Sequence, residues 1–532
     1  MKEWDRVIDS GREADVALLL EGTYPYVSGG VSSWVHQIIN GFPMLSFSLI
    51  FLGGSPSDYG EIKYPLLPNV RHLERHYLLE SWQKAIPRPR RGNAEVFAQI
   101  RGMHAALRQR QGRLPAEEIA EALRSLGRTD RLSREDFLFS EEAWSMITDH
   151  YERFCTDPSF VDYFWTVRTM HAPLFLLSRV ADRMPPCRVL HSISTGYAGM
   201  LGVLVHQRRG LPLILSEHGI YTKERKIDLA QADWIPDASE AFGGSLDDDV
   251  SYIRHLWIRF FEGIGRLAYD ASEVIVSLYE GNRQRQIADG ADPERCVIIP
   301  NGINVERFLP VRNSRPEGVP PILGLIGRVV PIKDIKTFIR AMRGVCNAIP
   351  EAEGWIIGPE DEDPEYAEEC RNLVVSLGLE DNVRFLGFRK VEEILSEIGL
   401  LVLTSISEAL PLVILEGFAA GVPALATDVG SCRDLIEGGT EEDRALGSAG
   451  AVVSIANPEE TARAAIALLT DEERWRAARD AGIARVERFY TQPLMYERYM
   501  ELYRRCLQMQ TDDAEPENAD ADAPPATGEA GH

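Results

Sequence analysis

Two acidic residues, Glu408 and Glu416, flank a segment with the features of a loop between a strand and a helix. The apolar run 400–403 before it predicts a strand, and Pro411 stands where the first residue of a helix is expected. Glu408 is therefore predicted to lie in the loop at the carboxyl end of the strand. Glu416 is predicted to lie about a turn and a half into the helix.

The helix N-terminus between these two acids offers free amides and the positive end of the helix dipole, which together suit a phosphate group. Carboxylates accept hydrogen bonds from hydroxyl groups. The combination indicates a ligand that carries both phosphate and hydroxyls, and a nucleotide sugar fits that description. The alternative is a surface loop and helix with an incidental pair of acids.

A second element upstream has matching chemistry. Gly327, Arg328 and Lys333 follow an apolar run and precede a predicted helix, so both cations are expected at the top of a strand. Arginine grips a pyrophosphate through its planar fork, and lysine adds a point charge. The alternative for either cation alone is a solvated surface charge.

Gly327, Arg328, Lys333, Glu408 and Glu416 together resemble the motif residues of the retaining glycosyltransferases of family 4, which have the two-domain GT-B fold. The resemblance implies that Arg328 and Lys333 bind the donor diphosphate. It implies that Glu416 binds the ribose hydroxyls and that Glu408 contacts the donor sugar near its reacting carbon. Further donor-side candidates are Leu412, Val413, Gly327 and Phe388.

The composition of the chain limits the classes of function that it can have. The chain has 532 residues and a formal net charge of −24, which argues against broad nucleic-acid binding and requires any phosphate site to be a local basic pocket. No apolar run approaches the roughly 20 residues that span a bilayer. The seven cysteines are scattered, which predicts reduced thiols and a cytoplasmic protein.

Strand-like runs alternate with helical runs over most of the chain, which predicts an α/β fold with parallel sheets. With the resemblance, this becomes a GT-B fold of two Rossmann-like domains that face a cleft. The expected parts are an N-terminal acceptor-side domain over 1–312 with a helical insertion at about 59–186, a linker over 313–321, a C-terminal nucleotide-sugar-binding domain over 322–490, a terminal helix over 491–508 and a disordered acidic tail over 509–532.

Gly29 and Gly30 precede the first predicted helix. A glycine pair there allows close backbone approach to an anion or sugar, and family 4 enzymes have a Gly-Gly loop that faces the donor; a tight turn is the equal alternative. The nearby Tyr24, Tyr26 and Trp34 have side chains suited to stacking on a sugar, with burial in the core as the alternative.

Two histidines follow predicted strands. His218 precedes the strand-breaking Gly219, and the family has a histidine at this place that contacts the donor sugar, so His218 is a catalytic candidate. His191 is a weaker candidate, and a structural role is the alternative for both. Lys223 lies in a cationic segment, 221–228, which is predicted to be either a phosphate or acceptor contact or a charged surface loop.

Three segments, 21–36, 216–228 and 427–433, look like the signature of the PelF-type glycosyltransferases, which act in Pel exopolysaccharide biosynthesis in bacteria. This resemblance implies a glycan acceptor and partner proteins of polysaccharide synthesis and export at the inner membrane. One departure from the general family pattern is the run Gly-Ser-Cys-Arg-Asp over 430–434, where many members have Gly-Gly and then Glu. It says little about the donor.

The resulting hypothesis is an enzyme that transfers a hexosyl unit from a UDP-sugar and needs neither a metal nor another cofactor, because cations and helix amides meet the diphosphate charge. Two alternatives stay open. One is a sugar-nucleotide epimerase on the same scaffold, against which the pair of glutamates argues. The other is a non-catalytic nucleotide-sugar-binding subunit of an assembly.

Overall fold

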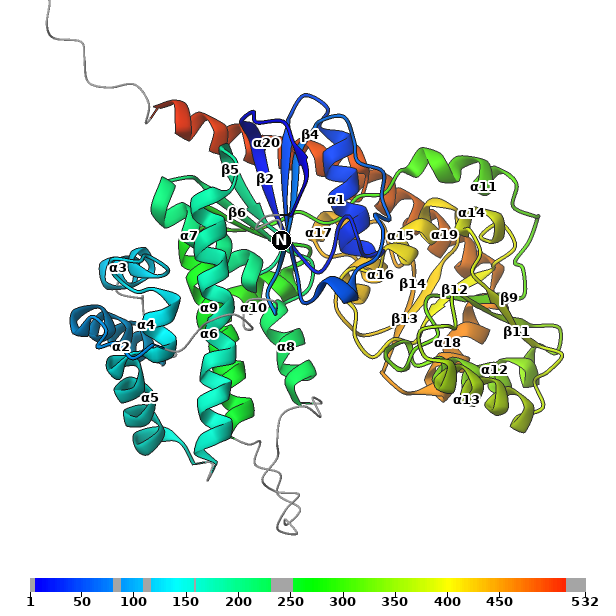
Figure 1. Ribbon diagram of the computed structural model, residues 1–532. Helices are drawn as coiled ribbons and strands as arrows, with labels where there is room; N and C mark the ends of the chain where they lie inside the picture. Colours follow the sequence, from blue (N-terminus) through cyan, green and yellow to red (C-terminus); the bar gives the residue numbers. More distant parts are fainter. Residues whose placement is uncertain (1–4, 80–87, 109–115, 157–158, 231–251, 513–532) are drawn as a thin grey trace, which may run out of the picture. The chain divides into compact units, whose positions relative to one another are not determined.

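The computed structural model describes residues 5–79, 88–108, 116–156, 159–230 and 252–512. Residue contacts divide the chain into two compact units, and the strands form two largely parallel sheets with helices around them (Figure 1). The first unit consists of Met1–Ser216, Arg225–Val274 and Met500–His532, and the second consists of Glu217–Glu224 and Ile275–Tyr499.

The strands form two sheets, one of eight strands in the order β1-β4-β3-β2-β5-β6-β7-β8 and one of six in the order β11-β10-β9-β12-β13-β14. The strands are β1 Asp5–Asp9, β2 Ala14–Glu21, β3 Phe47–Gly53, β4 Val70–Tyr77, β5 Cys187–Ser192, β6 Leu213–Glu217, β7 Val274–Ser277, β8 Cys296–Ile298, β9 Ile322–Ile326, β10 Glu353–Ile357, β11 Val383–Gly387, β12 Leu400–Leu403, β13 Ala424–Thr427 and β14 Gly450–Val453.

The helices before the six-stranded sheet are α1 Gly30–Gly41, α2 Ala94–Arg108, α3 Ala116–Ser125, α4 Arg134–Phe139, α5 Glu141–Phe154, α6 Phe160–Arg183, α7 Tyr197–Arg209, α8 Tyr221–Ala230, α9 Tyr252–Ala271, α10 Glu280–Ala288 and α11 Leu309–Asn313. Those that follow are α12 Ile335–Ala348, α13 Pro364–Ser376, α14 Val391–Ile394, α15 Leu412–Ala419, α16 Cys432–Glu437, α17 Glu441–Arg444, α18 Pro458–Leu469, α19 Glu472–Phe489 and α20 Gln492–Asp512.

In the six-stranded sheet every neighbouring pair is parallel. Leu401 and Leu403 of β12 pack on one face of this sheet, with α15, α16 and α19, whereas Leu400 and Val402 pack on the other, with α12, α13 and α18. Successive strand side chains point to opposite faces, so a strand covered by helices on both sides reads as a continuous apolar run. This is why the apolar runs predicted these strands correctly.

Both sheets reverse their strand order beside their first long strand. The chain moves outward from β9 to β11 and then returns to place β12 on the other side of β9, and it does the same in the eight-stranded sheet around β2 and β5. Such a reversal opens a crevice at the carboxyl ends of the two central strands, where ligands bind in open α/β sheets. We call it the switch point of each sheet.

The predicted helical insertion at 59–186 starts too early. β4, Val70–Tyr77, lies inside that range, pairs in parallel with β3 and is covered at the edge by the antiparallel β1. Sequence reasoning missed both strands because β4 is rich in charge. Its Glu74 is fully buried, with His72 Nε2 at 3.1 Å and His76 Nε2 at 3.0 Å from its carboxylate oxygens.

The helical part of the insertion begins at α2 and runs to α6. Helices α6, α7 and α9 pack against one another, and α2 to α5 gather beside α6 (Figure 1). The cationic segment 221–228, predicted as a loop in one of its two interpretations, forms helix α8. There Lys226 pairs with Glu262 at 2.6 Å, and Arg225 lies over the ring of Phe261.

The tyrosines and tryptophan offered for sugar stacking belong to the core. Tyr24, Tyr26 and Trp34 are at most 4% exposed, so their rings pack against protein and the stacking interpretation is wrong. The seven cysteines are free thiols, as predicted. Within the described residues, no helix is long and apolar enough to cross a bilayer.

The predicted terminal helix is α20, which extends to Asp512, past the start of the predicted tail; residues 513–532 lie outside the described part of the chain. Tyr503 of this helix is fully buried and its hydroxyl is 2.7 Å from His191 Nδ1. The other nitrogen of that ring, Nε2, is 2.8 Å from Ser216 Oγ. The C-terminal helix is therefore anchored to β5 and β6 by a buried polar chain.

We expect Tyr503→Phe to lower the free energy of unfolding by about 1–3 kcal/mol, because a buried ring nitrogen of His191 loses its partner. Tyr503→Ala should lower it by about 3–5 kcal/mol, because a cavity is added. Urea denaturation of the two variants checks this order. Equal stability of Tyr503→Phe and the parent would show that the hydrogen bond is not needed.

Candidate functional site

The predicted donor-binding residues gather at the switch point of the six-stranded sheet. β9 is followed by Gly327, Arg328 and the turn that holds Lys333, and β12 is followed by the loop that holds Glu408. β9 and β12 are neighbours, so their carboxyl ends meet. Lys333 Nζ donates a hydrogen bond to Glu408 Oε1 at 2.6 Å. Two residues 75 positions apart in the chain are thus joined.

Four hydrogen bonds fix the two loops that carry this pair. Thr404 Oγ1 donates to the carbonyl oxygens of Lys333 and Asp334, each at 3.0 Å. The Ile406 amide donates to the Ile332 carbonyl at 2.9 Å, and Thr427 Oγ1 donates to the Ser405 carbonyl at 2.6 Å. These hydrogen bonds to backbone carbonyl oxygens fix the two loops, so the position of the ion pair does not depend on the Lys333 and Glu408 side chains alone.

Glu408 has one engaged and one open carboxylate oxygen. Oε1 accepts from both Lys333 and Ser405 Oγ, each at 2.6 Å. Oε2 has no hydrogen-bond partner among the described residues, and the side chain is 13% exposed. The carboxylate is thus oriented on one side while the other side remains able to accept a hydrogen bond from a ligand hydroxyl.

Glu416 lies in helix α15, one turn from its start. Burial raises the pKa of its carboxyl from 4.5 to about 7, Arg307 opposes this shift, and Glu392 adds to it. Arg307 and Glu392 form an ion pair with each other. The Glu416 side chain is half-buried, and its carboxylate makes no hydrogen bond to any described residue, so it is partly desolvated and remains able to accept hydrogen bonds from a ligand.

Helix α15 begins one residue later than predicted. Pro411 is its N-cap in extended conformation, and Leu412 is the first helical residue. The amides of Leu412 and Val413 find no acceptor in the part of the chain that the structure describes, as is usual for the first turn of a helix. They are half-buried donors beside Glu416.

Arg328 and Phe388 are the exposed members of the candidate set. Arg328 Nη1 pairs with the carboxylate of Glu362 at 2.5 and 2.6 Å, and both side chains are about half exposed. Such a surface ion pair is worth no more than about 1 kcal/mol, so Arg328 can exchange this partner for a phosphate. Phe388 is 76% exposed, directly after β11.

The glutamate loop rests on Gly430. This residue has φ +56, and a Cβ built on it would lie 2.2 Å from the Glu408 carbonyl oxygen. The next amide, of Ser431, donates to the Ala409 carbonyl at 2.9 Å. The run 430–434, noted above as a departure from the family pattern, thus supports the backbone of Glu408.

The histidine candidates have different surroundings. His218 is 8% exposed, burial lowers its pKa to about 4, and its Nδ1 lies 3.4 Å from the Asn301 side-chain amide. Its imidazole is therefore neutral near pH 7 and carries one donor and one acceptor. His191 is fully buried with hydrogen bonds at both ring nitrogens, which favours the structural alternative.

Gly29, Gly30 and Lys223 are exposed. A Cβ built on either glycine meets no atom within 4 Å, and the φ of 165 at Gly29 is extended backbone that any residue adopts. A tight turn therefore does not require these two glycines, and the open space beside them is available to a ligand. Lys223 lies in the first turn of α8.

Sequence reasoning missed the supporting residues Arg307, Glu392, Thr404, Thr427 and Gly430. Arg307 and Glu392 are 85 residues apart, and neither stands in a motif. Thr404 directly follows the apolar strand run 400–403, and Thr427 ends the run 424–427. This position at a strand end is the local signal in the sequence that marks the carboxyl edge of the sheet.

The family comparisons agree with the fold. A family model described as "Glycosyl transferases group 1" matches residues 320–471, which include Arg328, Lys333, Glu408 and Glu416 but not Gly29, Gly30 or His218. The chain is a glycosyltransferase with the GT-B fold. A second family model, described as "Domain of unknown function (DUF3492)", matches residues 14–294, more than half of the chain. The chain belongs to that family.

Among curated proteins, the chain is 25% identical to the alpha-maltose-1-phosphate synthase of Mycolicibacterium smegmatis over 368 residues, which cover 64% of this chain and 85% of that protein. It is 26% identical to the D-inositol 3-phosphate glycosyltransferase of Kineococcus radiotolerans over 331 residues, 58% of this chain and 70% of that protein.

Two solved structures show the same fold. The sucrose-phosphate synthase (tll1590) from Thermosynechococcus elongatus has a TM-score of 0.54 and 16% identity, covering 93% of this chain and 100% of that one. Anabaena Alr3699/HepE in complex with UDP has a TM-score of 0.53 and 12% identity, covering 92% and 100%.

We predict that Gly430→Ala lowers kcat/KM by roughly a hundredfold, because the added methyl group displaces the Glu408 backbone from its position. Gly421→Ala is the matched control. Gly421 also has a positive φ, +76, but a Cβ there meets only side-chain atoms at 3.5 Å or more. Both variants carry the same backbone strain of about 1–2 kcal/mol, so equal losses of activity would contradict the role of Gly430.

We predict that Glu416→Gln stabilises the free protein increasingly as the pH rises. The carboxyl has a pKa of about 7 when folded and 4.5 when unfolded. Above pH 4.5 the unfolded chain therefore releases a proton that the folded chain retains, and the contribution of Glu416 to stability falls until about pH 7.

Chemical denaturation of the parent and Glu416→Gln at about pH 5 and about pH 8 should show the gap between them widening by roughly 1–3 kcal/mol in favour of the variant. A gap that does not change with pH would show that the carboxyl is not desolvated.

Proposed function

We propose that the protein is a retaining glycosyltransferase of family 4 and of the PelF type. It transfers a hexosyl unit from a UDP-sugar, either UDP-glucose or a related UDP-hexose or UDP-N-acetylhexosamine, to a growing bacterial exopolysaccharide, Pel. The proposal rests chiefly on one arrangement: an anchored Lys333–Glu408 pair and an unsatisfied Glu416 carboxylate at the switch point of the second sheet.

The donor diphosphate binds Arg328, Lys333 and the free amides of Leu412 and Val413. Arg328 reaches it after leaving Glu362, and Gly327 lets the backbone approach. Charge-assisted hydrogen bonds of this kind are stronger than neutral ones. Glu416 ionises on binding and accepts hydrogen bonds from the two ribose hydroxyls, which satisfy the carboxylate that the free protein leaves without a partner.

Glu408 orients the donor sugar through its open Oε2, while Lys333 and Ser405 hold the other oxygen. In the reaction, the bond between the sugar carbon and the diphosphate oxygen breaks, and its electron pair goes to that oxygen. The acceptor hydroxyl forms the new bond on the same face, and its proton passes to the leaving phosphate. Lys333 and Arg328 stabilise the charge that develops on that phosphate.

The remaining candidates are assigned to the sugar and acceptor side. His218, as a neutral imidazole, offers a hydrogen bond to the donor sugar, and Gly29, Gly30 and Lys223 offer exposed contacts. Phe388 and His191 are given no contact with the donor. Phe388 is exposed, and His191 already has partners at both ring nitrogens. The diphosphate charge is met without a metal or another cofactor.

The comparisons support the donor class in general terms. The Anabaena neighbour was solved with UDP, and the curated relatives are named as a synthase of maltose 1-phosphate and as inositol phosphate glycosyltransferases. The Pel acceptor rests on the three signature segments, 21–36, 216–228 and 427–433. A cytoplasmic location, with partner proteins of polysaccharide synthesis and export at the inner membrane, follows from the same resemblance.

A scan of UDP-sugars for thermal stabilisation of the purified protein identifies the donor, since ligands that bind the native state raise its melting temperature. The release of UDP with the best donor then measures turnover.

We expect Lys333→Gln to lower kcat by roughly a hundred- to a thousandfold, because the positive charge that stabilises the leaving diphosphate is lost.

Lys336→Gln is the matched control for that variant. Lys336 is three positions further on and pairs with Glu369 at 2.5 Å, on a helix surface outside the candidate site, so activity should persist. Addition of EDTA should leave the parent's turnover intact. A strict need for a divalent metal would contradict the proposed charge balance, and tight UDP binding with no turnover of any UDP-sugar would favour the non-catalytic subunit.

A further inference from the structure

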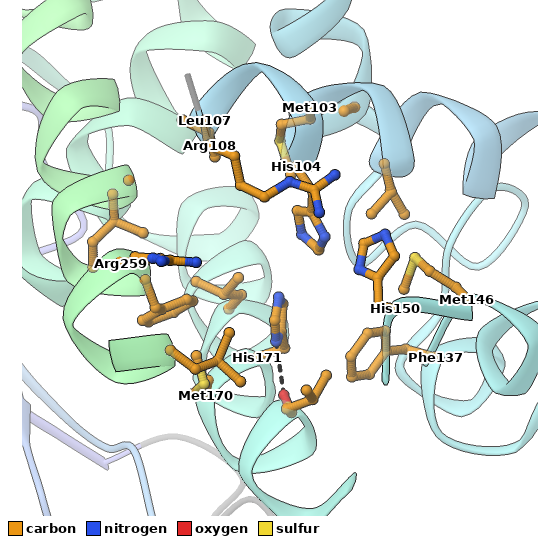
Figure 2. A pocket seen from close by; sticks show the side chains of 18 of the residues that line it. Met103, His104, Leu107, Arg108, Phe137, Met146, His150, Met170, His171 and Arg259 are labelled. Atoms are coloured by element: carbon orange, nitrogen blue, oxygen red, sulfur yellow. Dashed lines mark hydrogen bonds between the residues drawn. The ribbon is translucent and has the colours of Figure 1, made fainter. Parts of the chain in front are cut away.

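Helices of the insertion, together with α7 and α9, line a cavity whose residues are remote in sequence from the donor-side residues. It has a volume of about 410 Å³ and is lined by α2 to α7 and α9, all of which belong to the first unit (Figure 2). Protein interiors have few voids larger than a water molecule, and emptying a core is destabilising. The cavity is partly open to solvent, and its volume falls within the range of small-molecule sites, roughly 300–1,000 Å³, so it has room for a ligand.

Most of its wall is apolar. The side chains come from every surrounding helix and include Met103, Leu107, Phe137, Met146 and Met170. Methionine is unbranched and adapts its shape, so a wall with several methionines fits a flexible hydrocarbon body. An apolar body bound here would gain the transfer free energy of leaving water.

Three histidines converge on this apolar space. His104, His150 and His171 point into it from α2, α5 and α6 (Figure 2). Their rings form a chain, with centroids 6.2 Å apart between His104 and His150 and 5.4 Å apart between His104 and His171. They are the polar centre of the cavity.

Burial lowers the pKa of all three histidines, and neighbouring positive charges, including Arg108 beside His104 and His150, lower it further. The rings are therefore neutral near pH 7. His171 Nδ1 donates to the Val167 carbonyl at 2.7 Å, which leaves its Nε2 as an acceptor. His104 and His150 have no hydrogen-bond partner among the described residues. An anionic oxygen of a ligand can accept from the N–H group of His104 or His150, whereas His171 Nε2 can pair only with a ligand hydroxyl that donates.

The charged residues of the wall favour an anion. Arg108 and Arg259 border the cavity (Figure 2). Arg108 stacks on the Phe154 ring at 4.3 Å, and Arg259 makes no ion pair with any described residue. The one acid of the wall, Glu262, is neutralised by Lys226 at 2.6 Å. Arg108 and Arg259 are therefore two exposed cations, without an ion-pair partner among the described residues, that border the apolar space.

We propose that this cavity is a second ligand site, which binds an anionic amphiphile: a hydrocarbon body among the methionines and an acidic head group, carboxylate or phosphate, held by Arg259, Arg108 and the N–H donors of His104 and His150. The site does not depend on the proposed glycosyl transfer, because its residues lie in the insertion, in α7 and in α9, and none of them belongs to the donor-side set.

Calorimetry with the full chain tests this, with decanoate and decyl phosphate as the two acidic probes, below their micellar concentrations. A neutral decyl glycoside tests the need for the charge, and inorganic phosphate tests the need for the hydrocarbon body. We expect at least one acidic probe to bind, and the tighter of the two identifies the head group. The neutral probe should bind at least roughly tenfold more weakly, because it loses a charge-assisted contact.

Arg259→Gln should weaken the acidic probe at least roughly tenfold and leave the neutral probe unchanged. Arg179→Gln, an exposed change on α6 outside the cavity wall, is the matched control and should have no effect. Ala122→Leu, which fills part of the space, should weaken every probe with a hydrocarbon body. Glu416→Gln should not change probe affinity, which separates this site from the donor site.

The proposal is overturned if neither acidic probe binds, if the neutral probe binds as tightly, or if inorganic phosphate alone binds as tightly as decyl phosphate. It is also overturned if binding survives both Arg259→Gln and Ala122→Leu, because the probes would then occupy another surface. Circular dichroism melts of each variant show that the fold is retained before the binding data are interpreted.

Discussion

The ion pair between Lys333 and Glu408 is the contact around which the second unit's carboxyl edge is arranged. A half-buried pair contributes little stability by itself, because desolvation offsets most of the attraction. Its value here is geometric. Threonine hydroxyls at the ends of β12 and β13 hold the two loops, and Gly430 lies against the Glu408 backbone from the other side. A lysine and a carboxylate are thus fixed at the switch point before any ligand arrives, which lowers the ordering cost of binding.

Glu416 differs from the Lys333–Glu408 pair, because no described residue forms a hydrogen bond to its carboxylate. Its half-buried carboxyl is near the Arg307–Glu392 pair and has no hydrogen bond of its own among the described residues, so the free protein bears a partial desolvation penalty that a pair of ligand hydroxyls would reduce. Glu408 is satisfied on one side and open on the other, whereas Glu416 is unsatisfied. Glu408 therefore orients the ligand. Glu416 gains its hydrogen bonds only when the ligand is present, so binding lowers the free energy of this residue and favours the bound state.

The sequence predicted what is local. Apolar runs identified most strands because both faces of each sheet are covered, and the donor-side candidates were visible because they stand at strand ends in short motifs. It failed where tertiary contacts override the local pattern. β4 was missed because its Glu74 is charged in the sequence pattern yet buried in the structure, where Arg6 of the distant strand β1 and two histidines of β4 pair with it. Tyr24 and Trp34 are core residues despite their loop and helix-start context, and Arg307 gave no signal because its partner is distant in the chain.

Electrostatics links the two sites of this acidic molecule. The chain carries a net charge of −24, which repels anions at long range, yet both sites are inferred to bind anions. At physiological ionic strength the Debye length is about 8 Å, so the distant acids are largely screened, whereas a partly buried cation a few ångströms from its ligand is not. The net charge therefore slows the encounter with a ligand, and the local cations decide whether it stays. At the switch point the local cation is Lys333, next to the free amides of α15. At the cavity it is the exposed Arg259 of α9, which shares the wall with neutral histidines that add no further positive charge.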